Sequence, residues 1–236
     1  MAKKKFFSKD YLPNFHDKEG SLEKITDEKN MARKIGSQLA LVSGLAFLYG
    51  IVMGCFNGFS QALSSAVKMP VLFLLLIIIC FPAFYVIQSV LGSRLTLPQM
   101  GSIILSGFVY TTSIMVSFST IVLFFLITGG NYAFIQLLHV AVIGLAGVFG
   151  MKHIIDALKY SCEKKNVYPK TGIVVFRFWI VILFFVGSQL SWSLRPFIGA
   201  KGMPFELFRK QEGNFYQALA NSFADLVDPG GRRPGR

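Results

Sequence analysis

The chain has 236 residues, of which 53% are hydrophobic, 14% aromatic and 15% charged, and its formal net charge is +12. Soluble domains carry about a quarter charged residues, so this composition indicates a multi-pass membrane protein. The basic residues gather at 3–34, 152–177 and 195–236, where the first two groups flank apolar stretches. That arrangement follows the positive-inside pattern and argues against a nucleic-acid partner.

Residues 1–38 are predicted to form a cytoplasmic segment. Positions 1–33 are polar and charged without an apolar signal core, so the first span is expected to act as the insertion signal. Apolar residues recur on one helix face between 21 and 35. We expect a helix here that either lies on the membrane or continues into the first span.

The first span, residues 39–56, is rich in small residues at four-residue intervals. These residues are Ala46, Gly50, Gly54 and Gly58. Small side chains at this interval line one helix face and allow another helix to approach closely. Packing within the chain is favoured over homodimerisation, because a multi-span protein must first pack its own helices. The residues that follow, 57–69, carry one charge, Lys68, and are predicted to form an outward loop.

The second span, residues 70–91, contains no charged residue. A helix of this length is about 30 Å long, enough to cross the hydrocarbon core of a bilayer. We expect the helix to begin at Pro70, because proline is favoured in the first helical turn. Pro82 removes a backbone hydrogen bond and is expected to kink the helix.

The third span, residues 103–127, is rich in hydroxyl side chains. They belong to Thr111, Thr112, Ser113, Ser117, Ser119 and Thr120. Such a stripe could line a solute pathway, but hydroxyls equally donate to carbonyls of their own helix or to a neighbour. The fourth span, 132–151, is predicted to continue into a cytoplasmic helix, 152–159, and the fifth span covers 172–194.

Five spans leave the two ends of the chain on opposite sides of the membrane. Residues 1–37 hold nine lysines and arginines and 152–170 hold five, whereas the two short outward loops hold one between them. The positive-inside rule then places the N-terminus inside and the C-terminus outside. We predict a bacterial-type cytoplasmic (inner) membrane as the location.

The C-terminal part, residues 195–236, is predicted to be an extracytoplasmic amphipathic tail. Trp192 and Phe197 occupy positions typical of an aromatic belt. Arg195 is expected to anchor a lipid head group, or to tie the tail to the bundle through Glu206 or Glu212. From residue 214, apolar side chains at three- and four-residue spacing predict a helix on the outer surface that ends at Pro229-Gly230. The predicted partner-contacting residues are Trp192, Arg195, Phe197, Phe215 and Tyr216.

The sequence offers little catalytic chemistry. His139 and His153 lie about 21 Å apart on one helix and cannot share a metal ion. The three cysteines, Cys55, Cys80 and Cys162, have neither disulfide nor zinc spacing. All twelve acidic residues lie outside the spans, and no nucleophile, metalloprotease or nucleotide-binding motif is present. We therefore expect neither an enzyme nor a cofactor or metal site.

The five spans, the cytoplasmic N-terminal region and the proline-containing second span resemble the Yip (Ypt/Rab-interacting protein) superfamily and its bacterial relatives. The similarity covers residues 39–194 and is carried mainly by 66–92. The aspartate and glycine-proline signature of eukaryotic members is missing, and the long amphipathic tail is a departure. The resemblance implies a five-span membrane protein without Rab binding.

These observations predict an all-α integral membrane bundle. Its predicted partners are the lipid bilayer and either other membrane proteins or a second copy of the chain. The leading functional hypothesis is a non-enzymatic scaffold or a subunit of a larger membrane assembly. The competing hypothesis is a small transporter or channel that uses the third span. An enzyme acting through Cys162, His139 and Ser60 is third.

Overall fold

The computed structural model describes residues 31–163, 169–199, 207 and 215–227, leaving out the side chain at 225. These residues form helices and no strand. The helices are α2 (Met31–Gly54), α3 (Phe59–Val90), α4 (Leu97–Ile127), α5 (Tyr132–Glu163), α6 (Lys170–Ser193) and α7 (Phe215–Val227). All but α7 are long and apolar enough to cross a membrane. The predicted all-α bundle with five spans is confirmed.

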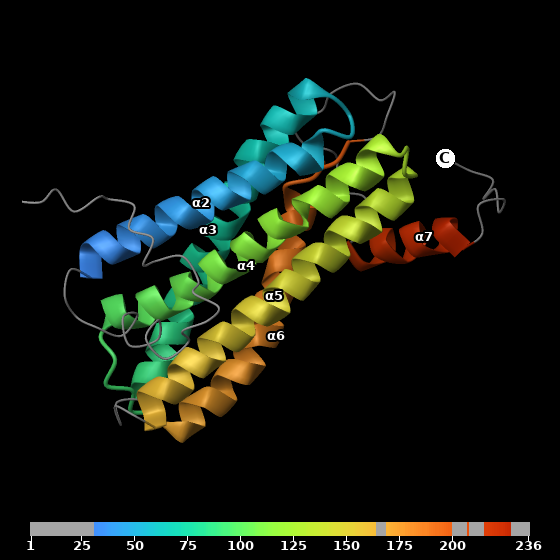
Figure 1. Cartoon of the computed structure of the whole chain (residues 1–236). Helices are drawn as coiled ribbons and strands as arrows, with labels where there is room; N and C mark the ends of the chain where they lie inside the picture. The colour runs from blue at the N-terminus through green and yellow to red at the C-terminus, as the bar shows by residue number, and fades with distance from the viewer. Residues whose placement is uncertain (1–30, 164–168, 200–206, 208–214, 228–236) are drawn as a thin grey trace, which may run out of the picture.

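The five long helices lie roughly side by side, and α7 lies against α5 and α6 near one end of them (Figure 1). That end also holds the α2–α3 and α4–α5 turns, and we call it the outer end, after the predicted orientation. Helix α2 packs closely on α3 and α4, and α4 packs closely on α5. Helix α6 makes fewer contacts and lies against α3 and α5.

Glycines bring α2 and α3 into close contact. A methyl group built on Gly50 would lie 2.8 Å from Ala66 Cα, and one on Gly54 would lie 2.5 Å from Ala62 Cα. Ala46 is fully buried on the same face of α2. Gly58 does not belong to this face, because α2 ends at Gly54 and Gly58 precedes α3 with a φ of 113°.

The prediction that residues 57–69 form a loop and that a helix begins at Pro70 is wrong. Helix α3 begins at Phe59, so Pro70 lies inside it, and Lys68 is only 6% exposed. The segment is not apolar enough to be recognised as a span. It is helical because its small residues pack against the glycine face of α2.

The hydroxyl groups of α4 mostly donate to carbonyls one turn earlier in the same helix. Thr111 Oγ1 donates to Gly107 O at 2.9 Å and Ser117 Oγ to Ser113 O at 2.9 Å. Thr112, Ser113 and Ser119 do the same. Their hydrogen-bonding needs are met inside α4, which is the second of the two interpretations of this stripe.

Candidate ligand cavity at the outer end of the bundle

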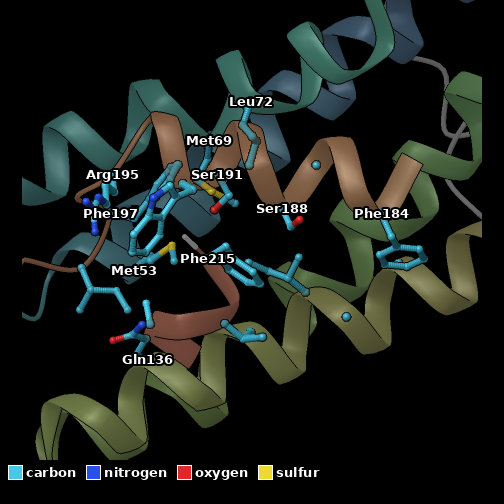
Figure 2. A pocket seen from close by; sticks show the side chains of 18 of the residues that line it. Met53, Met69, Leu72, Gln136, Phe184, Ser188, Ser191, Arg195, Phe197 and Phe215 are labelled. Atoms are coloured by element: carbon cyan, nitrogen blue, oxygen red, sulfur yellow. The ribbon is translucent and has the colours of Figure 1, made fainter. Parts of the chain in front are cut away.

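A large, partly open cavity of about 1240 Å³ is lined mainly by residues of α3, α5, α6 and α7 (Figure 2). Its walls are mainly apolar. The lining side chains include Met69, Leu72, Phe73 and Leu76 of α3, Val140, Ile143 and Met151 of α5, and Leu183 and Phe184 of α6. Ligand pockets in proteins are clefts or cavities of this kind, with mainly apolar walls and a few polar groups.

The cavity exists because α6 is held to the bundle mainly by its inner half. Phe176 packs edge-on against Phe84 with ring centroids 5.1 Å apart, and Gln88 Nε2 donates to Gly172 O at 3.2 Å. Leu183 is the last residue of α6 that is buried. Beyond it, α6 offers small residues to the cavity, namely Gly187, Ser188 and Ser191.

Two glycines of α5 have different surroundings. Gly150 packs against α4, since a methyl group there would lie 2.7 Å from Gly107 O. Gly144 lines the cavity, and a methyl group there would have no atom within 4 Å. The absent side chain at Gly144 therefore leaves open space and makes no close helix contact.

Residues 195–198 line the cavity and are docked onto α3. Gln61 Nε2 donates to Pro196 O at 2.9 Å and to Phe197 O at 3.1 Å. Ser65 Oγ also donates to Phe197 O, and Lys68 Nζ donates to Pro196 O at 3.1 Å. These three polar side chains are all buried. The docking segment is thus fixed by backbone carbonyls that are satisfied from α3.

Sequence reasoning missed this docking surface. Gln61, Ser65 and Lys68 recur at four- and three-residue spacing, which places them on one face of a helix. That spacing was a usable signal. The prediction of a loop over residues 57–69 hides it, because a loop has no common face.

Helix α7 covers the cavity with its more polar side. Gln217, Asn221 and Ser222 line the cavity together with Phe215, while Phe223 and Val227 on other positions are 60% and 70% exposed. The hydroxyl groups of Tyr216 and Ser188 lie 3.2 Å apart and link α7 to α6.

Arg195 is the only charged side chain among the described residues that line the cavity. Its guanidinium lies over the ring of Trp192, 3.6 Å from the ring centroid. Figure 2 places Arg195 and Gln136 at one end of the cavity and Phe184 at the other. The alternative carboxylate partners, Glu206 and Glu212, lie outside the described residues.

The structure brings together four of the predicted partner-contacting residues. Trp192, Arg195, Phe197 and Phe215 all line the cavity, whereas Tyr216 does not. The small residues of α2 lie elsewhere, in the contact with α3.

A buried polar pair lies apart from the cavity. Tyr49 of α2 and His139 of α5 share a hydrogen bond of 2.8 Å between the hydroxyl and Nδ1. Both side chains are fully buried, and their rings meet edge to face. Within the described residues, no three His, Cys, Asp or Glu side chains come close enough to hold a metal ion.

No protein-family model, curated protein or solved structure matches the chain.

Proposed function

We propose that this chain is a non-enzymatic membrane protein that binds a lipid-like amphiphile in the cavity at the outer end of the bundle. The observation that carries the proposal is a cavity of about 1240 Å³ whose lining is mainly apolar. Its volume exceeds the range of about 300–1,000 Å³ typical of small-molecule pockets. A ligand with one or more long apolar chains suits that space.

The walls of the cavity suit acyl chains. The cavity is partly open to its surroundings, and its walls are mainly leucine, isoleucine, methionine and phenylalanine side chains. Water finds few hydrogen-bonding partners against such walls. Acyl chains make only apolar contacts and therefore match them.

The test is native mass spectrometry of the protein purified in mild detergent and exposed to vesicle lipids. Gly144→Phe grows a bulky side chain from α5 into the cavity, and Gly44→Phe places the same side chain on α2, where a methyl group also has no atom within 4 Å. We expect the wild type and Gly44→Phe to retain a stoichiometric lipid, and Gly144→Phe to lose it at least about tenfold. Equal lipid retention by the two folded variants would refute the proposal.

The role as a scaffold or subunit of a larger assembly, with other membrane proteins or a second copy as partners, fits the exposed apolar side chains of α7. Tyr216, Phe223, Leu226 and Val227 are all exposed. An exposed apolar row on an outer helix suits either the membrane interface or a protein partner. Cross-linking and pull-down from native membranes distinguish these, since a stoichiometric protein partner lost on Phe223→Ser supports the subunit role.

We also propose that the protein lies in the inner membrane with its N-terminus inside, and that it is related to the Yip superfamily. These proposals are supported by the distribution of lysines and arginines and by the five spans. The transporter hypothesis loses support from the third span, because its hydroxyls mostly donate within α4. Flux of a solute in proteoliposomes would restore it.

A further inference from the structure

Helix α7 is amphipathic, and its two sides have different surroundings. The side that lines the cavity consists of Phe215, Gln217, Ala218, Asn221 and Ser222. Another side carries a row at helical spacing, which we call the exposed row and which consists of Tyr216, Ala220, Phe223 and Val227. Phe223 is 60% exposed and Val227 70%. The row contains no charged residue, so water does not suit it and a partner should cover it.

Helix α7 is attached to α6 below the end of the span. The hydroxyl groups of Tyr216 and Ser188 lie 3.2 Å apart. Ser188 precedes Trp192, which occupies a position typical of the aromatic belt, by one helical turn, or about 6 Å along α6. Figure 1 shows α7 beside the outer part of α5 and not beyond the α2–α3 and α4–α5 turns. The helix therefore lies at the level of the spans themselves.

The side of α6 to which α7 is attached faces lipid. Val181 and Phe185 precede Ser188 by seven and three residues, so the three residues lie on one face of the helix. Val181 is 67% exposed and Phe185 is 55% exposed. Exposed apolar side chains on a spanning helix lie in the hydrocarbon. Because Tyr216 begins the exposed row and contacts this face, the row continues the lipid-facing surface of α6.

The size of the exposed row also favours lipid over a protein partner. Three large, partly exposed apolar side chains offer on the order of 300 Å² of surface. Stable protein–protein interfaces bury about 1,200–2,000 Å² in total, half of it on each partner. Apolar helices of about 10–14 residues are too short to span and are typical of interfacial segments. Such helices bury their apolar face about 5–10 Å into the boundary between head groups and acyl chains.

We propose that α7 is inserted into the leaflet at the outer end of the bundle, with the exposed row in contact with the acyl chains of the bilayer. The partner of this row is thus the lipid itself. The helix lies deeper than one that rests on the membrane surface, since its contact with α6 is about one turn below the aromatic belt. This inference does not depend on whether the cavity holds a ligand.

The depth of the exposed row can be measured by tryptophan fluorescence. The chain has two tryptophans, so Trp179→Phe combined with Trp192→Phe gives a background that keeps an aromatic ring at both positions. Phe223→Trp in that background places a single reporter in the row. The purified protein is reconstituted into phosphatidylcholine vesicles whose lipids carry bromine either near the head group or near the chain ends. Bromine quenches from within the bilayer, and iodide quenches from the water.

Two further reporters in the same background calibrate the depth. Phe59→Trp marks the outer surface, because Phe59 is the first residue of α3 and is 84% exposed. Ile78→Trp marks the hydrocarbon interior, because Ile78 lies near the middle of α3 and is 65% exposed. We expect bromine near the head group to quench Phe223→Trp at least about twofold more than bromine near the chain ends. Ile78→Trp should show the opposite preference, and iodide should quench Phe223→Trp at least about threefold less than Phe59→Trp.

Iodide quenching of Phe223→Trp as strong as that of Phe59→Trp would overturn the proposal, because the row would then face water. Weak quenching by both iodide and brominated lipids would also overturn it, since a protein surface would then cover the row. If that protection disappears at a lower ratio of protein to lipid, the covering surface belongs to a second copy of the chain. Tyr216→Trp, at the start of the row, repeats the measurement with the same expected outcome if Phe223→Trp does not fold.

Discussion

The contact between α2 and α3 allows a sharp test of how glycine stabilises this bundle. Gly50→Ala adds a methyl group that would lie 2.8 Å from Ala66 Cα and 2.9 Å from the backbone carbon of Ser65. Carbon atoms in good contact are about 3.5–4.0 Å apart, so the two helices would have to separate by roughly 1 Å. Backbone atoms cannot rotate away as a flexible side chain can.

The matched control is Gly44→Ala, on the same helix, where the added methyl group has no atom within 4 Å. Both substitutions gain the same helix propensity, about 1 kcal/mol, so this gain cancels in the comparison. The remaining difference is the cost of overpacking, about 1–3 kcal/mol. We therefore expect Gly50→Ala to be less stable than Gly44→Ala by that amount.

The measurement is reversible unfolding in mixed micelles with increasing dodecyl sulfate, followed by tryptophan fluorescence. Trp179 is suitable because its ring lies 6.0 Å from that of Phe84 inside the bundle. Equal stability of the Gly50→Ala and Gly44→Ala variants, within about 0.5 kcal/mol, would show that the helices separate without cost and that the reasoning is wrong. A difference that depends on protein concentration would instead indicate that the glycine face mediates homodimerisation.

Three further predictions use other contacts of the structure. Gln61→Leu removes the amide that holds the docked segment, and we expect the free energy of unfolding to fall by about 1–3 kcal/mol in the same assay; unchanged stability would contradict this. Tyr49→Phe removes the hydrogen-bond partner of His139 and is expected to lower the free energy of unfolding by about 1–3 kcal/mol. Adding His139→Leu should recover part of that loss. If the two losses instead add in a double-mutant cycle, the two side chains do not stabilise each other. On intact cells, a membrane-impermeant maleimide should label Cys55, which is exposed near the outer end of the bundle. It should label Cys162 only after the membrane is permeabilised. The reverse pattern would show that the chain has the opposite orientation.

The number of spans and most helix ends followed from the sequence for a simple reason. In a bilayer every backbone polar group must be satisfied within the chain, so a long apolar run has to be a helix. The predicted ends at 127, 132, 172 and 194 lie within two residues of the observed ends of α4, α5 and α6, whereas α4 begins at Leu97, six residues before the predicted start. The start of α3 was missed because residues 59–69 become helical through contact with α2, which is not encoded in their own hydropathy.

The chemistry of the candidate site could be recognised in part from local sequence. Trp192, Arg195 and Phe197 stood out because aromatic and basic residues just after a span are typical of a membrane interface. Their position beside Phe215 and against Gln61 brings together residues that are distant along the chain. No pattern of spacing contains that information, since it depends on how α3, α6 and α7 meet.

The glycines show the same division most clearly. By itself the sequence determined that α2 and α5 carry small residues at helical spacing, and such residues usually mark close packing in membranes. Gly50 and Gly150 do pack closely, but Gly144, on the same helix as Gly150, opens onto the cavity. A glycine in the sequence shows only that no side chain is present at that position. Whether a neighbouring helix fills that space is decided by the tertiary structure, here by an α6 that is buried only as far as Leu183.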